Sequence, residues 1–542
     1  MDQIPHNIYY KKLLKRFKAF TITAFMASFF ALACTSTIDL PPIEEHIASP
    51  IDVAAGGLNG VNKFFFVLNS NLNHTYSDGS ILVMNKDGSK KSSISIPRLG
   101  RSIKIAGNRL IVTFDADPND KERSKVMLFQ IDYTPDPELP TLTLQKEWMF
   151  DDCRALNSVL HSDYKHFAVA CESGKLLLGT FPNDDLTQAR LVTARRYPSD
   201  RTGYTKRAMF IDSTNNLLYA FMIDMNTPKN GDSYKKDTQT WNKETESFDN
   251  GANDIPDEQE KSKARRSNLA DKGNPFQYVI IDLNDTNNFE NDEFKFREFK
   301  DIQDELYWMN FKLQDLSDEI EQPEPLEGTK EENKYFRSNF WEALPDPNST
   351  SSFYLSHRGG STAPHANNVV HVTLKAGVNP REQKLTQDIF DFKRIYGFKN
   401  QRDAHHQYPY LGAFAFTKVN DTDVLIVNHF RSRKDFGEDH FSIQAIKGSS
   451  DSSNPIIFKN NPFAARQSSK ISSGTYYQFA ICDSDDGEPY VLTSLFYNDS
   501  LKIFKLNQNN ASPETTETED EAKLNSHAAN RANNLSEIAT IQ

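Results

Sequence analysis

The stretch Pro489–Leu506, PYVLTSLFYNDSLKIFKL, decides the fold of this chain. Two runs rich in β-branched and aromatic residues flank the polar turn Tyr497-Asn498-Asp499, a pattern typical of two antiparallel strands. The same strand–turn–strand phrase recurs seven times along the sequence. The first strand of each pair begins at Lys63, Arg109, His166, Leu217, Ser351, Asp423 and Pro489, and the second begins at Gly79, Ser124, Lys175, Phe276, Asn368, Phe441 and Ser500.

Two weaker strands precede most of these pairs. In the clearest case they are SISIP from Ser93 and SIKIA from Ser102, ahead of the pair that begins at Arg109. Units of four antiparallel strands repeated seven times predict an all-β fold, a seven-bladed β-propeller of four-stranded antiparallel blades. Two stacked β-sheets are the alternative, because they would also show alternating strands.

The two ends of the chain predict how the ring closes. The first copy shows only three strands, the earliest of them weak, near Ile51–Ala54, whereas SEIATIQ from Ser536 has no partner in its own copy. We therefore expect the C-terminal strand to supply the inner strand of blade one, because a closed ring removes exposed sheet edges. The polar and acidic stretch 508–534 is predicted to be a loose arm that leads to that strand.

The first residues have the pattern of a targeting signal. A basic region precedes the apolar run Ala19–Ala33, which is shorter than the roughly 20 residues that a membrane-spanning helix needs. Ala31-Leu32-Ala33-Cys34 resembles the bacterial lipobox, in which a signal peptide, here 1–33, is removed and the cysteine is lipidated. Because Thr35 rather than Asp follows Cys34, the resemblance implies the outer membrane, on a side that the sequence leaves open. An ordinary secretory peptide or an amphipathic anchor is the alternative.

The mature chain divides into a tether, 34–49, and the propeller, 50–542. Hydrophilic insertions interrupt the repeat at 225–274 and 300–333, and Ile302–Ile320 has the apolar spacing of a short helix. With the strand order given above, every large insertion leaves the ring on one face. Extra length on one face is better explained by use than by topology, so we expect the function on that face.

Composition and cysteine content exclude some classes of protein. The 542 residues carry a net charge of −12 and no basic stripe, which argues against a nucleic-acid partner. A hydrophobic fraction of 38% excludes a polytopic membrane protein. Cys153 and Cys171 flank one predicted hairpin and could form a disulfide in an exported chain. The alternative is that these two and Cys482 are all small buried residues.

The residues between positions 357 and 440 are the best candidates for a binding site. Three connections from adjacent blades are expected to meet near the channel mouth, where Arg could grip an anion and His or Asp could hold a divalent metal. A solvated polar rim is the alternative, and no compact metal-binding spacing favours the metal, so no cofactor is predicted beyond that one candidate. The candidate binding residues are His357, Arg358, His365, Arg402, Asp403, His405, His406, Arg431, Arg433 and His440.

The strand pair that includes YVIIDLND from Tyr278 resembles the repeats of YVTN-type propellers, a WD40-like group. The resemblance covers Ile51–Leu506 with degenerate motifs, and it implies the fold rather than a ligand. No nucleophile elbow, phosphate-binding loop or dinucleotide fingerprint is present in the sequence. The prediction is therefore a lipid-anchored cell-envelope β-propeller that acts as a binding or scaffold module for a protein or glycan partner. The alternative is a metal-dependent propeller hydrolase or lactonase with its site at the channel mouth.

Overall fold

The computed structural model describes a chain made almost entirely of strands. Its only described helices are three short 3-10 segments: η1 (Leu58–Gly60), η2 (Pro182–Asp184) and η3 (Leu186–Gln188). No helix within the described residues is long and apolar enough to cross a membrane. The described residues are 40–72, 75–115, 123–133, 138–150, 153, 155–160, 165–171, 176–193, 204–212, 214–224, 240–242, 247–249, 276–284, 306–309, 340–346, 348–349, 351–357, 368–378, 390–397, 410–430, 440–448, 467–470, 478–496, 499–506 and 535–541.

The described strands form seven four-stranded antiparallel sheets and one two-stranded sheet. The first three sheets contain β1 (Pro50–Gly56), β2 (Phe64–Asn69), β3 (Gly79–Asn85) and β4 (Lys91–Ile96); β5 (Gly100–Ala106), β6 (Arg109–Phe114), β7 (Ser124–Asp132) and β8 (Thr141–Phe150); and β9 (Ala155–Leu160), β10 (His166–Cys171), β11 (Leu176–Thr180) and β12 (Arg190–Thr193). The fourth contains β13 (Tyr204–Asp212), β14 (Leu217–Asp224), β17 (Phe276–Asp282) and β18 (Leu306–Met309), and β15 (Thr240–Asn242) pairs separately with β16 (Ser247–Asp249).

The remaining sheets follow the same order from the inner to the outer strand. The fifth contains β19 (Phe340–Pro345), β20 (Phe353–His357), β21 (Asn368–Leu374) and β22 (Phe390–Gly397). The sixth contains β23 (Tyr410–Val419), β24 (Thr422–Phe430), β25 (His440–Lys447) and β26 (Gln467–Lys470). The last contains β27 (Phe479–Cys482), β28 (Tyr490–Leu495), β29 (Ser500–Leu506) and β30 (Leu535–Ile541).

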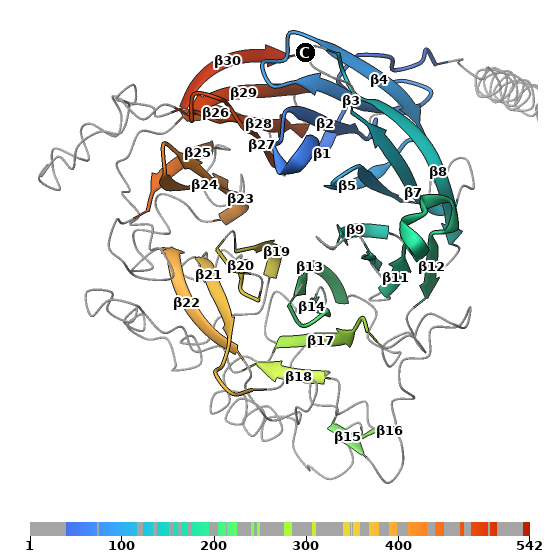
Figure 1. Ribbon diagram of the computed structural model, residues 1–542, viewed down its shortest axis with the longest axis vertical. Helices are drawn as coiled ribbons and strands as arrows, with labels where there is room; N and C mark the ends of the chain where they lie inside the picture. Colours follow the sequence, from blue (N-terminus) through green and yellow to red (C-terminus); the bar gives the residue numbers. More distant parts are fainter. Residues whose placement is uncertain are drawn as a thin grey trace, which may run out of the picture.

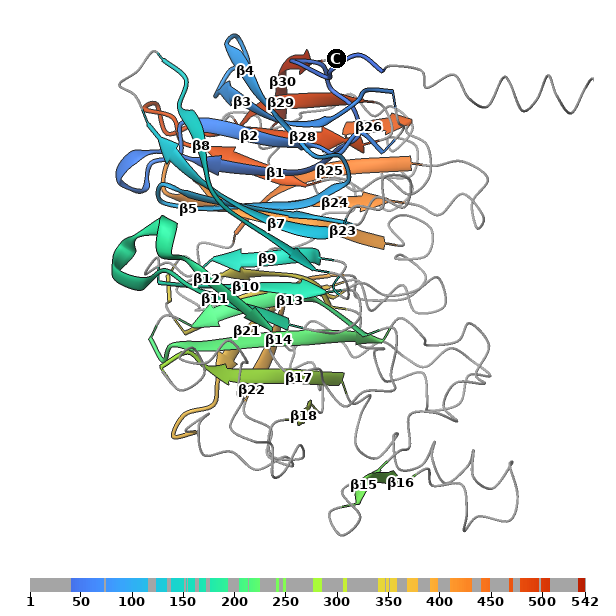
Figure 2. The same cartoon turned by 90° about the vertical axis from the view of Figure 1, so that its right-hand side faces the viewer.

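The sheets are arranged radially around a common axis, as the blades of a β-propeller (Figure 1). The inner strand of each sheet contacts the inner strand of the next, and β27 of the last sheet contacts β1 of the first. The β-propeller prediction is therefore confirmed. In the side view the strands of successive sheets are seen stacked along the vertical direction (Figure 2).

The core consists of apolar clusters between neighbouring sheets. Phe66 of the first sheet packs with Phe114 of the second, and Tyr219 of the fourth packs with Phe353 of the fifth, with ring centroids 6.0 Å apart. Strands β2 and β6 are buried at every residue. Both faces of a middle strand must be apolar because each face contacts a different neighbour, which explains the continuous apolar runs in the sequence.

The ring closes by packing and hydrogen bonding between the first and last sheets. Val67 of β2 and Leu501 of β29 belong to one buried cluster. Asn62 and Asp483 exchange hydrogen bonds: the Asn62 N–H donates to Asp483 Oδ2 at 2.7 Å, and the Asp483 N–H donates to the Asn62 carbonyl at 2.7 Å. At the opposite end of β1, the Ser49 N–H donates to Asp499 Oδ1 at 2.6 Å.

The prediction that the C-terminal strand supplies the inner strand of blade one is wrong. Strand β30 pairs with β29, from Leu501↔Ile541 to Leu506↔Leu535, as the outermost strand of the last sheet. The first sheet has its own inner strand, β1, which pairs with β2. The apparent gap arose because β1, PIDVAAG, is less apolar than the strands beside it.

The predicted four-strand unit is also shifted by one strand. The run SISIP from Ser93, taken as the first strand of a unit, lies mostly in β4, which folds back onto β3 as the outermost strand of the preceding sheet. A short polar turn allows this pairing, whereas strand spacing alone does not say which neighbour a strand joins. Each strand runs from one face of the ring to the other, so consecutive connections alternate between the two faces. The shift therefore does not change which connections share a face.

The insertions differ from the prediction in one element. Within 300–333, the region expected to be helical includes strand β18, in which Leu306 pairs with Val279 and Met309 with Phe276 of β17. Leu, Tyr and Trp at positions 306–308 favour a strand, and pairing with β17 overrides the local helical spacing. Within 225–274, the described residues contribute the small β15–β16 hairpin, which lies outside the ring (Figure 2).

The last part of the predicted tether belongs to the folded ring. Ile43, Ile47 and Ala48 are buried. The Ile43 N–H donates to Asp78 Oδ1 at 2.8 Å, and the Ser77 N–H donates to the Pro41 carbonyl at 2.9 Å. The interval 34–49 therefore contains a packed segment from Pro41 onward.

Cys153 and Cys171 form a disulfide in the structure, with a Cα–Cα distance of 5.1 Å. Cys171 is the last residue of β10, and Cys153 lies just before β9. Cys482 is the free cysteine of the described residues and is fully buried, which raises the pKa of its thiol. The pairing left open by the sequence is thus present in the structure.

Candidate functional site

The connections between strands emerge on two faces of the ring. We call the entry face the one that carries the connections between the second and third strands of a sheet and between successive sheets. The turn face carries the connections between first and second strands and between third and fourth strands. Strand β1 begins at the entry face, next to the Ser49–Asp499 hydrogen bond.

Strand topology places the ends of the three candidate connections on the entry face. His357 ends β20 and pairs with Asn368 of β21, and Phe430 ends β24 and pairs with Phe441 of β25. The connection 398–409 joins β22 to β23, between the fifth and sixth sheets. Because β19 contacts β23, these sheets are neighbours, and the three connections begin and end at one sector of the entry face.

The side chains of the ten candidate residues are outside the described part of the structure. For His357 and His440 the backbone is described, at the end of β20 and the start of β25. Arg358, His365, Arg402, Asp403, His405, His406, Arg431 and Arg433 lie outside the described residues. Their contacts with each other therefore stay a prediction.

The expectation of one elaborated face is wrong. The entry face carries the long connections 225–275 and 310–339, but the turn face carries 283–305 and 507–534, because β30 returns to the last sheet. The first-to-second-strand connections are all short. For example, β23 and β24 are joined by Asn420 and Asp421, both at positive φ (44° and 66°), as in a tight hairpin turn.

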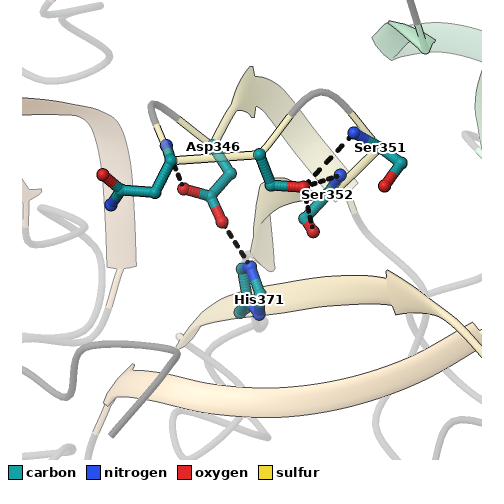
Figure 3. A network of polar contacts seen from close by, with 6 residues as sticks. Asp346, Ser351, Ser352 and His371 are labelled. Atoms are coloured by element: carbon teal, nitrogen blue, oxygen red, sulfur yellow. Dashed lines mark hydrogen bonds and ion pairs between the residues drawn. The ribbon is translucent and has the colours of Figure 1, made fainter. Parts of the chain in front are cut away.

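A buried polar network lies in the fifth sheet, at the turn-face end of β19 (Figure 3). His371 of β21 donates from Nε2 to Asp346 Oδ2 at 2.8 Å, and their side chains are only 3% and 1% exposed. Asp346 Oδ1 also accepts from the Asn348 N–H at 2.9 Å. The network ties the β19–β20 turn to the third strand of the sheet.

Tyr354 of β20 lies beside this network. Its ring lies 4.9 Å from the His371 ring, measured between the centroids. Burial, together with the charges of Asp346 and Asp423, raises the pKa of the Tyr354 phenol above its ordinary value. Tyr354 also packs on Phe416 of the sixth sheet, with centroids 4.2 Å apart.

The Asp346–His371 pair joins the β19–β20 turn to β21 within the buried interior. Nδ1, the second ring nitrogen of His371, has no hydrogen-bond partner among the residues that the structure describes. The nearby Ser349 hydroxyl accepts from the Ser352 N–H at 3.1 Å. Sequence reasoning missed this pair, although a lone histidine inside the apolar run NVVHVTL signals a buried partner.

A polar groove of about 680 Å³ lies on the outer side of the first sheet. One wall is the packed N-terminal segment Pro42–His46, and the floor is formed by the outer strands β3 and β4. Pairing of Ser80 with Ser95 and of Leu82 with Ser93 places both of these β4 serines on one face of the sheet. The lining residues are Pro42, Ile43, Glu44, Glu45, His46, Asp78, Ser80, Lys91, Ser92, Ser93 and Ser95.

Among the residues that the structure describes, no group of three or more His, Cys, Asp or Glu side chains could hold a metal ion. The acidic stretch 483–488 is a hairpin turn between β27 and β28. In it, Asp486 accepts from the Glu488 N–H and from Lys505 Nζ. The hydrogen bond from Lys505 lowers the pKa of the Asp486 carboxyl.

Comparisons with known proteins identify similar propellers at low identity. No protein-family model and no curated protein matches this sequence. The β-propeller domain of Myceliophteria thermophila Cps50 (Swd1) is 9% identical, with a TM-score of 0.42, over 86% of this chain and 99% of that one. A putative 6-phosphogluconolactonase from Bacteroides uniformis is 9% identical, with a TM-score of 0.40, over 86% and 96%. Chaetomium thermophilum Sqt1, bound to the N-terminus of ribosomal protein L10, is 9% identical, with a TM-score of 0.39, over 86% and 89%.

Proposed function

We propose that this protein is a seven-bladed, lipid-anchored β-propeller of the bacterial cell envelope that binds a partner protein through its entry face. The observation that carries the proposal is the position of the strand ends that flank three polar connections, 358–367, 398–409 and 431–439. These strand ends lie at the entry face of neighbouring sheets. Seven four-stranded sheets in the described residues support the blade count. The ring acts as a rigid scaffold, and the connections supply the contacts.

The composition of these connections fits a polar recognition surface. Arg402, Arg431 and Arg433 offer planar guanidinium groups that bind carboxylates through two parallel hydrogen bonds. Histidines between them add donors, acceptors and aromatic area, which is the mixture found at protein interfaces.

The position of the N-terminal segment supports the anchor. If Cys34 is lipidated, residues 35–40 separate the lipid from the packed segment that begins at Pro41, a span of about 20 Å at full extension. The lipid would hold the ring close to the outer membrane, with the entry face beside the point of attachment. Two or more acyl chains give stable membrane binding, whereas one chain binds only marginally.

Site-specific photo-crosslinking in intact cells tests the binding surface. A photoreactive amino acid replaces His405 or Arg431 on the entry face, and Asn108 or Asp485 in turns of the opposite face provides the matched control. We expect discrete protein adducts from the entry-face positions and none of the same size from the controls. Equal adducts from both faces, or adducts with glycan alone, would contradict the proposal.

Fractionation of Cys34→Ala tests the anchor. The wild-type protein should sediment with the outer membrane and become soluble only in detergent. The variant, with its thiol removed, should be released from that fraction. Unchanged membrane association of Cys34→Ala would refute lipidation at this residue, and it would leave the crosslinking result to be judged separately.

A further inference from the structure

The groove on the outer side of the first sheet is a second candidate site, separate from the entry-face surface. We propose that it binds a neutral oligosaccharide. The proposal depends on the shape, stability and chemistry of the groove and does not rest on the partner proposed above.

The wall of the groove is held in place before any ligand arrives. Ile43 is fully buried beneath it, and the His46 N–H donates to the Ile43 carbonyl at 3.0 Å. Asn69 Nδ2 donates to the His46 carbonyl at 3.3 Å, and Lys91 Nζ donates to the Glu45 carbonyl at 3.3 Å. A wall fixed by these bonds loses little conformational entropy on binding.

The floor presents two accessible hydroxyl groups on one face of the strand pair. Ser93 is half-buried and Ser95 is exposed on β4, the outermost strand, whereas Ser80 of β3 is buried beneath them. The Ser80 hydroxyl accepts from Asn69 Nδ2 at 2.9 Å, and Ser95 is hydrogen-bonded to Asp78. Hydroxyls both donate and accept hydrogen bonds, so Ser93 and Ser95 match the donors and acceptors of sugar hydroxyls.

The rim adds an aromatic surface and acceptors. The exposed His46 ring stacks on Tyr76, with centroids 5.7 Å apart and planes within 10° of each other. Stacked rings beside a polar groove provide a flat apolar surface for the C–H face of a sugar. Glu44 and Glu45 are exposed beside this pair and offer carboxylate oxygens.

Charge and volume narrow the ligand class. The lining holds Glu44, Glu45 and Asp78 against the single cation Lys91, which lies 4.0 Å from Glu45, so an anionic ligand would be repelled. The apolar lining residues are Pro42 and the buried Ile43, which leaves little to hold an apolar side chain. A groove of about 680 Å³ has the size of sites that hold small ligands, enough for a short chain of sugars.

Glycan-array binding followed by calorimetry tests the proposal on the purified full chain in detergent. The probes are short neutral oligosaccharides, among them maltotriose, cellotriose and triacetylchitotriose, with uronic-acid and sulfated counterparts. We expect binding of neutral members. Ser93→Tyr should abolish it by filling the groove, and His46→Ala should weaken it by about tenfold, the effect of losing one good contact.

Ser89→Tyr is the matched control, because Ser89 is exposed in the turn beside β4, outside the groove lining. It should bind like the wild type. Tyr suits a strand, so Ser93→Tyr is expected to fold, and thermal unfolding checks this; His46→Ala provides an independent readout. The proposal is overturned if no neutral oligosaccharide binds, if only anionic glycans bind, or if Ser93→Tyr and His46→Ala both bind as the wild type does.

Discussion

Replacing Asp346 with alanine should destabilise the fifth blade more than any other change to its surface turns. The Asp346 carboxylate is 1% exposed and accepts from His371 Nε2 and from the Asn348 N–H. Alanine removes both acceptor contacts at once. It leaves the His371 ring, 3% exposed, without a partner on either nitrogen, because Nδ1 already has none among the described residues.

The cost follows from stranding buried polar groups. Each buried donor left unsatisfied costs about 1–3 kcal/mol, and one such donor, His371 Nε2–H, remains in the buried interior. We therefore expect Asp346→Ala to lower the free energy of unfolding by about 2 kcal/mol. Asp346→Asn retains an oxygen acceptor and should cost about 1 kcal/mol. Ser349→Ala, in the same turn, removes acceptor contacts near the surface and provides the control.

Urea denaturation monitored by circular dichroism gives the change in unfolding free energy, and hydrogen exchange locates it. Exchange should accelerate first in β19–β21 of the Asp346→Ala protein, while the first sheet remains protected. A loss below about 0.5 kcal/mol, or exchange that accelerates equally in all sheets, would refute the view that this network holds the blade together.

Three further predictions concern titration, closure and the disulfide. Because the pKa of Tyr354 is raised in the folded state, the free energy of unfolding should be independent of this group below about pH 10 and fall as pH rises further; Tyr354→Phe should show a weaker fall in alkaline denaturation curves. Deleting 535–542 should remove only the outermost strand of the last sheet, so size-exclusion chromatography should still give a compact monomer, whereas an opened, expanded chain would favour C-terminal closure of blade one. Reducing Cys153–Cys171 should lower the unfolding free energy by about 3 kcal/mol, as expected for a loop of this length, and Cys153→Ser should remove that sensitivity to reductant.

Much of the fold follows from the sequence because each middle strand is apolar on both faces. Runs such as FFFVLN and RLIVTF can be satisfied only between two neighbours, and their repetition implies a ring of sheets. The sequence did not show in the same way which strand begins each four-strand unit. The weak strands β4 and β8 are half-exposed, so their composition does not distinguish the outer strand of one blade from the inner strand of the next.

The candidate sites also differ in how far the sequence alone predicts them. Strand order predicted that three polar connections leave neighbouring sheets on one face, since this depends only on alternation of chain direction. The buried Asp346–His371 pair and the groove beside Ser93 unite residues from separate strands and, for the groove, from a segment expected to be a tether. Neither grouping has a local sequence pattern.

The sequence alone predicted the class of fold, because repeated strands that are apolar on both faces favour a radial arrangement of sheets over two stacked sheets. Only the tertiary structure decided how the ring closes. The C-terminal strand could hydrogen-bond to either the first or the last sheet with equal local propensity. Packing of Val67 and Leu501 across the seam, with the Asn62–Asp483 bonds at one face and the Ser49–Asp499 bond at the other, joins the sheets without exchanging a strand. The free edge of β29 is then the one left for Leu535–Ile541 to cover.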